Sequence, residues 1–142
     1  MTNTPPVTII DAEGATLGRI STYTAKKLLQ GEEIHIINSE KAIISGKKQM
    51  IKQKYQQKRD VGTHRKGPFY PRKPEMIVKR TVRGMLPYQK PHGREAFKRL
   101  KCHTGVPKEL EGKKPEKIKN AQKNPVDYMT VEELSKFLGA KM

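Results

Sequence analysis

Positive charge is distributed very unevenly along this chain of 142 residues. Residues 41–101 contain 19 Lys and Arg against three Asp and Glu. Residues 1–40 contain three cations and five acids, and residues 102–142 contain eight and six, so the middle segment accounts for the formal net charge of +16. Cations at this density repel one another, and a polyanionic partner is the usual reason to retain them. Any fold must therefore keep this segment at a surface.

The supply of apolar residues permits one core of modest size. Hydrophobic residues make up 34% of the chain, and charged residues make up 31%, above the roughly 25% of ordinary domains. We expect a single domain over residues 1–142, without a large apolar ligand cavity. No stretch approaches the roughly 20 apolar residues that cross a bilayer, and the first residues lack the pattern of a secretory signal. With one cysteine, Cys102, a cytoplasmic location is expected.

The order of the first predicted elements favours an α/β fold. Val7–Ile10 is β-branched and predicts a strand, and Leu17–Gln30 has apolar residues at helical spacing behind a possible N-cap, Thr16. Glu33–Asn38 predicts a second strand with a nearly continuous apolar run. Strand, helix and strand in this order predict a βαβ unit with parallel pairing and a right-handed crossover.

The rest of the chain predicts short elements separated by breakers. Short strands are expected at Ala42–Ile44 and Cys102–Thr104, and a loop rich in Gly and Pro at Asp60–Pro74. The pattern Thr130–Glu133 resembles a capping box that starts a final helix ending near Leu138. Three further helices are predicted at Gly46–Arg59, Glu75–Leu86 and Arg94–Lys101.

The basic middle segment is the strongest candidate for a binding surface. Lys and Arg neutralise phosphates and release counterions, while aromatic rings and Arg planes stack on unpaired bases. A solvated basic loop is the plainer interpretation, but the excess of cations over 61 residues favours nucleic acid. From this segment we predict RNA contacts by Lys47, Lys48, Lys52, Arg59, His64, Arg65, Lys66, Phe69, Tyr70, Arg72, Lys73, Arg80, Arg83, Lys90, Arg94 and Lys98.

Two other functions are weaker alternatives. A nucleotide-dependent enzyme would use the loop Gly14–Gly18, yet this loop matches neither G-x-G-x-x-G nor G-x-x-x-x-G-K-[ST], and Glu13 adds negative charge. Gly14 is expected to serve the turn, and Gly18 to allow close approach of another element. A chromatin or DNA-binding protein is the third possibility. Nucleotide titration, and competition between duplex DNA and structured RNA, would separate these alternatives.

Catalysis and metal binding have little support in the sequence. The four histidines, His35, His64, His92 and His103, are scattered, and no CxxC or HxxxH spacing occurs. Cys102 and His103 are adjacent in a predicted strand and therefore face opposite sides of a sheet. We expect no catalytic site, no metal and no cofactor.

Several strings resemble one known family. They are Ile10–Arg19, Ile37–Lys47 and Thr81–Pro87, followed by Gly93-Arg94 and Leu100-Lys101. Their order over residues 7–107 is similar to that of the universal ribosomal protein family L-thirteen of the large subunit. Arg65–Phe69 and the short link between the first helix and the second strand resemble its archaeal and eukaryotic branch. The resemblance ends after Pro107, so residues 108–142 are expected to be a C-terminal extension with a short final helix, and residues 1–6 a tail.

The resemblance implies a three-layer α/β/α domain around a small, mostly parallel sheet with basic helical and loop extensions. It also implies binding to large-subunit ribosomal RNA and neighbouring ribosomal proteins, a role in subunit assembly and translation, and neither membrane association nor homo-oligomers. The matched strings carry over as RNA contacts the positions Arg19, Lys47, Arg65, Lys66, Arg83 and Arg94. Gly84, Met85 and Leu86 are expected to serve packing and the turn.

Overall fold

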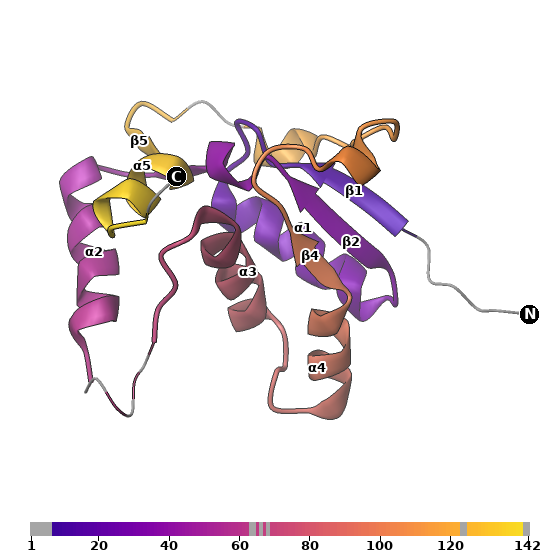
Figure 1. The fold of residues 1–142 in the computed structure, drawn as a ribbon, viewed down its shortest axis with the longest axis horizontal. Coiled ribbons are helices and arrows are strands. Elements are labelled where there is room, and N and C mark those ends of the chain that lie inside the picture. The colour runs from indigo at the N-terminus through magenta and orange to yellow at the C-terminus, as the bar shows by residue number, and fades with distance from the viewer. Residues whose placement is uncertain (1–6, 63–64, 66, 68, 123–124, 141–142) are drawn as a thin grey trace, which may run out of the picture.

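The computed structural model describes residues 7–62, 65, 67, 69–122 and 125–140. None of the helices in this described part is long and apolar enough to cross a membrane. The elements (Figure 1) are β1 Val7–Asp11, α1 Leu17–Leu29, β2 Glu33–Ile37, η1 Ser39–Lys41, β3 Ile43–Ser45, α2 Lys48–Asp60, α3 Pro74–Met85, α4 Pro91–Lys98, β4 Leu100–Cys102, η2 Lys108–Leu110, η3 Lys119–Ala121, β5 Tyr128–Thr130 and α5 Val131–Phe137.

The main sheet is parallel and has the strand order β1-β2-β4. Its register sets Ile9 opposite His35 and Ile34 opposite Leu100. Helix α1 connects β1 to β2, which is the βαβ unit that the β-branched and helical patterns predict. The expected α/β class with a small, mostly parallel sheet is confirmed.

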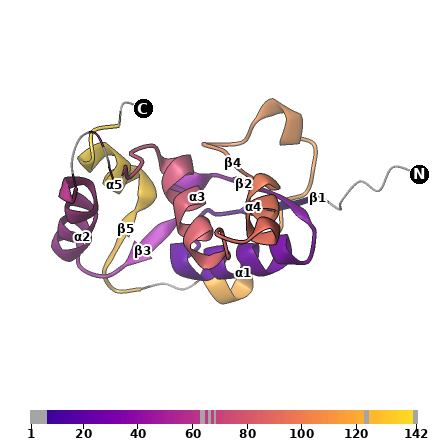
Figure 2. The same cartoon turned by 90° about the horizontal axis from the view of Figure 1, so that it is seen from below.

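The two faces of the main sheet are covered differently. Successive strand residues alternate between faces, so Ile10, Ile34 and Ile36 join the main core with α1 and α3. Helices α1, α3 and α4 contact one another on this face (Figure 2). On the opposite face Ile9 and Ile37 form a separate small cluster with Leu110 of η2. That face is therefore covered by the irregular segment that follows β4 and by its 3-10 turn.

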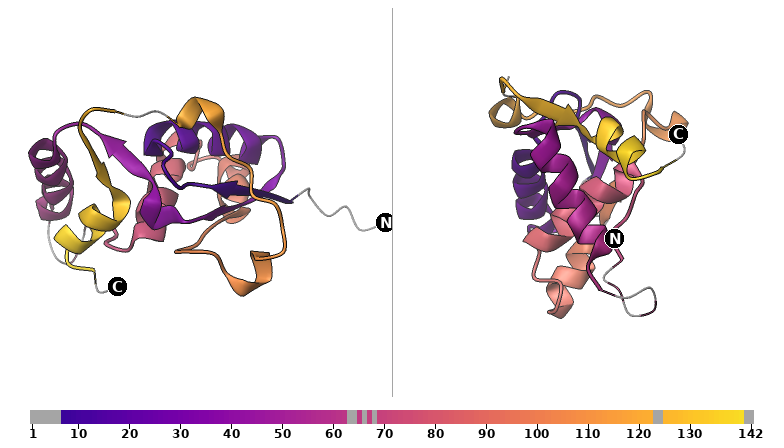
Figure 3. Two further views of the ribbon diagram at one scale, coloured as in Figure 1. Left: turned by 90° about the horizontal axis from the view of Figure 1, so that it is seen from above. Right: turned by 90° about the vertical axis from the view of Figure 1, so that its left-hand side faces the viewer.

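A second, two-stranded sheet pairs β3 with β5 in antiparallel register. The sequence did not predict β5, because its three residues give no periodic signal. Thr130 ends this strand and caps α5, and its hydroxyl oxygen accepts a hydrogen bond from the Glu133 N–H at 3.2 Å. Met129, Val131 and Leu134 are fully buried in the main core. The C-terminal extension thus packs against the body beside α2 (Figure 3).

The structure corrects two predictions around α4. This helix begins at Pro91, three residues before the predicted start at Arg94, because proline is well suited to the first helical position. Leu100 belongs to β4 and pairs with Ile34, whereas the sequence assigned it to the helix and placed the strand at Cys102–Thr104.

The glycine that permits close approach is Gly93 rather than Gly18. A Cβ at Gly18 would meet no atom within 4 Å, so the expected close contact there is wrong. A Cβ at Gly93 would overlap the carbonyl oxygen of Pro87. The Gly93 N–H also donates to the Lys90 carbonyl at 3.1 Å, so the turn between α3 and α4 folds directly onto α4. Gly14 has a φ of 71°, as the predicted turn requires.

We predict that Gly93→Ala lowers the free energy of unfolding by about 1–3 kcal/mol, the usual cost of overpacking. Denaturant unfolding of the purified protein measures this change. The matched control is Gly84→Ala in α3, where a Cβ meets nothing within 4 Å and φ is not positive. This control should raise stability by about 0.4–1 kcal/mol. Equal effects of the two substitutions would contradict the packing argument.

Two histidines join β2 to the segment that follows β4. The Nδ1 atom of His35 lies 3.1 Å from Nε2 of His103, and the rings stack with centroids 5.3 Å apart. His35 Nε2 lies 3.1 Å from a Glu33 carboxylate oxygen. Burial, followed by the charge of His35, lowers the pKa of His103 below its ordinary value. The pair is therefore held together best when His103 is neutral.

This depressed pKa predicts lower stability in acid. The unfolded chain protonates His103 near pH 6.5, whereas the folded protein resists protonation to lower pH. The free energy of unfolding contributed by His103 is thus complete above about pH 6.5 and falls as the pH falls through the folded-state pKa. Unfolding measured at pH 7.5 and 5.0 should show a larger loss in the wild type than in His103→Gln. The exposed His92, changed to Gln, should leave the wild-type loss unaltered.

Candidate nucleic-acid interface

Helix α3 separates apolar and cationic residues onto two sides. Ile77, Val78 and Val82 are completely buried against α1 and the main sheet. Lys79, Arg80 and Arg83 are only partly buried, on the side away from the core. A helix fixed through one apolar stripe must present its charged stripe outward.

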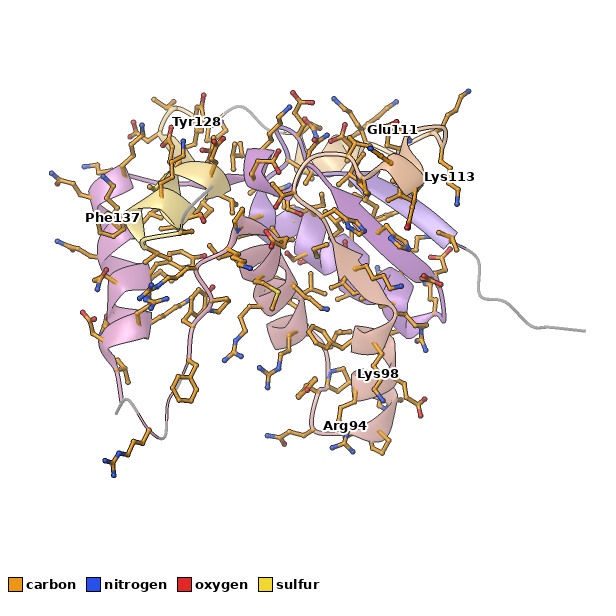
Figure 4. All side chains as sticks on the ribbon, viewed as in Figure 1. Arg94, Lys98, Glu111, Lys113, Tyr128 and Phe137 are labelled. Carbon is orange, nitrogen blue, oxygen red and sulfur yellow. The ribbon has the colours of Figure 1, made fainter. Side chains whose placement is uncertain are left out.

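Helix α4 and the turn before it extend this cationic side. Ala96 is buried and Phe97 is packed against the core, while Lys90, Arg94 and Lys98 are exposed. Arg94 and Lys98 are four residues apart and thus share one side of the helix. Figure 4 shows both side chains projecting from the end of the molecule that lies opposite Lys113 and Tyr128.

Helix α2 is anchored by Ile51 and Tyr55, and its remaining surface is basic. Lys48 forms an ion pair with Glu133 at 3.4 Å, and Lys52 lies over the Phe137 ring at 5.2 Å. The ion pair is solvent-exposed on both sides, so its contribution to stability is small.

The cations of the middle segment have few carboxylate partners. Among the described cations of residues 41–101, Lys48 alone forms an ion pair with a carboxylate. Ion pairs elsewhere in the described part of the chain include those of Lys27, His35, Lys117 and Lys136. Charge in the middle segment is therefore left for an external anion.

A hollow of about 800 Å³, here the larger hollow, lies between α2, α3 and the start of α1. The Lys58 amine lies 4.5 Å above the Tyr55 ring and 5.2 Å above the Tyr70 ring. Burial, followed by the charges of Lys54 and Arg80, lowers the pKa of Lys58. An anion in this hollow would relieve that repulsion. It is lined by Thr16, Leu17, Gly18, Ile44, Ser45, Lys54, Tyr55, Lys58, Val61, Tyr70, Arg80, Thr81, Gly84 and Met85.

A second hollow of about 400 Å³, here the smaller hollow, adjoins the first and shares Tyr70 and Arg80 with it. It combines rings with cations between the segment before α3 and the turn after it. Its lining residues are Phe69, Tyr70, Pro71, Met76, Lys79, Arg80, Arg83, Tyr88 and Phe97.

The structure brings only some of the predicted RNA contacts together. Phe69, Tyr70, Arg80 and Arg83 meet around the smaller hollow. Eight other predicted contacts are exposed but line neither hollow, namely Lys47, Lys48, Arg65, Arg72, Lys73, Lys90, Arg94 and Lys98.

Other predicted contacts have different surroundings. Arg59 donates to the Tyr70 carbonyl oxygen at 2.9 Å and thereby also holds the backbone of the loop. Arg19 lies on α1 beside Tyr23 and Ala121, in a hollow of its own. His64 and Lys66 lie outside the described residues.

Six cationic or aromatic residues that line the hollows were not among the predicted contacts, namely Lys54, Tyr55, Lys58, Lys79, Tyr88 and Phe97. Lys54 and Lys58 have i, i+4 spacing on a basic helix, which is a usable signal. Tyr88 gives no such signal, because it reaches the surface through the turn between α3 and α4.

The loop Gly14–Gly18 does not present its backbone donors to a ligand. The Gly14 N–H donates to Lys41 O at 3.1 Å, Ala15 N–H to Ala12 O at 3.0 Å, and Thr16 N–H to Ala121 O at 2.9 Å. A phosphate-binding loop needs such N–H groups free, so the geometry argues against the nucleotide site.

The carboxyl ends of the parallel strands, where α/β proteins commonly bind ligands, are also filled. The Asn38 side-chain amide donates to Asp11 at 3.1 Å, and the Gly105 N–H donates to Glu40 at 3.0 Å. Burial raises the pKa of the Cys102 thiol to about 12, which keeps it protonated. Within the described residues no cluster of His, Cys, Asp or Glu could hold a metal ion.

The comparisons with known proteins point to a family of ribosomal proteins, in agreement with the excess of positive charge and the α/β fold. The family model described as Ribosomal protein L13 matches residues 6–109. The chain is 53% identical over 140 residues to the large ribosomal subunit protein uL13 of Methanosphaera stadtmanae, covering 95% of this chain and 99% of the relative. It is 50% identical over 139 residues to the protein of that name from Methanocaldococcus jannaschii, with 95% and 99% covered.

A third relative, the large ribosomal subunit protein uL13 of Archaeoglobus fulgidus, is 49% identical over 136 residues, with 93% of this chain and 87% of the relative covered. Alignments this long include most of residues 108–142, although the family model ends at residue 109. The family model thus ends close to Pro107, the expected end of the resemblance, while these relatives align beyond it. The chain belongs to the ribosomal protein L13 family and, within it, to the archaeal branch.

Proposed function

We propose that this protein binds large-subunit ribosomal RNA through the surface formed by α2, α3, α4 and the described residues of the loop between α2 and α3, here the cationic surface. The observation that carries the proposal is the outward direction of these cations, of which Lys48 alone among those described forms an ion pair with a carboxylate. Its relatives are named as proteins of the large ribosomal subunit. The role is structural rather than catalytic, and it supports assembly of the subunit and translation.

Phosphate contacts provide affinity for RNA, and the shape of the folded RNA provides selectivity. Lys and Arg at the cationic surface neutralise backbone phosphates, which gives affinity without reading the base sequence. Folded RNA is distinguished from a uniform duplex by its shape and by unpaired nucleotides. The rest of the surface, over residues 7–40 and 102–140, is nearly neutral and suits contacts with neighbouring ribosomal proteins.

We predict that RNA affinity falls steeply as the salt concentration rises, and that cations of α4 and of the turn before it contribute to this dependence. With six to ten phosphates engaged, affinity should fall by about 10³–10⁵ between 50 and 200 mM salt. Changing Lys90, Arg94 and Lys98 together to Gln should reduce the slope of log K against log salt by about 2–3. Filter binding to a transcript of the large-subunit RNA measures both quantities.

The matched control removes three charges elsewhere. Lys108, Lys113 and Lys114 are exposed in the C-terminal extension, and Figure 4 shows Lys113 at the opposite end of the molecule from Arg94. Changing all three to Gln alters the net charge equally but should leave the slope near the wild-type value. If both triple variants reduce the slope alike, RNA attraction is a property of net charge and the cationic surface has no special role.

We also predict a preference for folded RNA over duplex DNA. Competition at fixed salt should show that the ribosomal transcript displaces a labelled RNA at lower nucleotide concentration than duplex DNA does, because shape and unpaired bases add to phosphate attraction. Equal potency of the two competitors would instead support a general DNA-binding protein.

A further inference from the structure

The smaller hollow differs in chemistry from the rest of the cationic surface. One side comes from Phe69, Tyr70 and Pro71, which precede α3. The other side comes from the end of α3, the turn after it and α4, through Arg83, Tyr88 and Phe97. Residues far apart in the chain therefore converge on one open hollow that contains rings as well as charge.

On the side formed by α3, the turn after it and α4, aromatic rings lie against cationic side chains. The Arg83 guanidinium lies 4.2 Å above the Tyr88 ring, and Lys79 lies 5.1 Å above the Phe97 ring. Tyr88 and Phe97 meet edge to face, with centroids 5.5 Å apart and an interplanar angle of 88°. These contacts orient Arg83 with one face on Tyr88, and guanidinium planes are surfaces on which bases stack.

Two apolar side chains of the hollow are left exposed to solvent. Phe69 is 67% exposed and Met76 is 44% exposed, so neither side chain belongs to the core. Exposed apolar groups that gather in one patch mark interaction sites on many proteins. The backbone beside Phe69 is held in place, since Arg59 donates to the Tyr70 carbonyl oxygen.

The lining of the hollow defines the class of ligand. It offers aromatic and apolar surface together with Lys79, Arg80 and Arg83, and no carboxylate is among its described residues. A planar aromatic group joined to an anion fits this combination, and a nucleotide is such a group. A volume of about 400 Å³ lies within the range of about 300–1,000 Å³ for small-ligand sites. The adjoining larger hollow, with Lys54 and Lys58, gives a continuing chain a second set of cations.

We propose that the smaller hollow receives one unpaired base of the bound RNA, stacked against Phe69 and Arg83, with a neighbouring phosphate at Arg80. This proposal rests on the proposed function and adds a non-electrostatic contact to it. Stacking is tolerant of base identity, because every base has a π face. The site therefore recognises a nucleotide that is free of a helix rather than a particular sequence.

The first test measures affinity for the ribosomal transcript. Phe69→Ala should weaken binding about 5- to 150-fold, the usual effect of losing one stacked base. The slope of log K against log salt should stay unchanged, because no charge is lost. Phe69→Tyr keeps the ring and should restore binding. Unaltered affinity of Phe69→Ala would overturn the proposal while salt-dependent RNA binding persists, whereas failure of the wild type to bind RNA would overturn the proposed function itself.

The second test observes stacking directly. The chain has no tryptophan, so Phe69→Trp introduces a single reporter. Its fluorescence should be quenched by the ribosomal transcript and by a ten-nucleotide uridine oligomer, but not by a fully paired RNA duplex bound equally well. The control is Val106→Trp, a site 44% exposed in the segment between β4 and η2 and outside the cationic surface, which should stay unquenched.

Other occupants give different results. Saturable quenching of the Phe69→Trp variant by micromolar adenosine monophosphate would identify a site for free nucleotides and overturn assignment to RNA. No quenching by any RNA that binds would overturn the proposal and leave the hollow to a segment of a neighbouring protein.

Discussion

The packing of α3 against α1 and the main sheet is the contact on which the cationic surface depends. Ile77, Val78 and Val82 are completely buried, and each fully buried aliphatic side chain contributes about 1.5–3 kcal/mol. This one-sided burial fixes the rotation of the helix about its axis. Lys79, Arg80 and Arg83 consequently have one direction in which to extend, and the turn that follows brings Tyr88 beneath Arg83. Core packing and the outward direction of these cations thus depend on two sides of the same helix.

The cations of this surface repel one another, and neighbouring aromatic rings reduce the repulsion. The pKa of Lys58 is lowered by burial and by the neighbouring charges of Lys54 and Arg80. Rings beneath the cations offset part of the repulsion, as Tyr55 and Tyr70 do for Lys58 and Phe97 does for Lys79. Carboxylates would do so more strongly, but they would also compete with phosphates for the same cations. The scarcity of acids in residues 41–101 is therefore what the proposed RNA contact requires, whereas folding alone does not require it.

Periodicity and charge were sufficient to predict the elements of the main body, because these signals are local. Three elements lie within a residue or two of the prediction, namely the strand Val7–Asp11, the helix Leu17–Leu29 and the strand Glu33–Ile37 that pairs with the first strand. The prediction failed where distant contacts decide the structure. Leu100 is a strand residue because Ile34 lies beside it, and β5 exists because β3 offers it an edge. Likewise, Tyr88 joins the smaller hollow through a turn whose shape Gly93 permits.

The C-terminal extension has a role in the site even though the family model ends at residue 109. Residues 69–73, of which Phe69, Tyr70 and Pro71 line one side of the smaller hollow, have no regular structure of their own. They are held from two directions, since Arg59 of α2 donates to the Tyr70 carbonyl oxygen at 2.9 Å and Ser135 of α5 donates to the Arg72 carbonyl oxygen at 2.6 Å. A loop fixed before binding loses less conformational entropy when a ligand orders it. Burial of Met129, Val131 and Leu134 places α5 where Ser135 can make this bond, so the extension helps to position the loop that is proposed to bind RNA, about 60 residues before it.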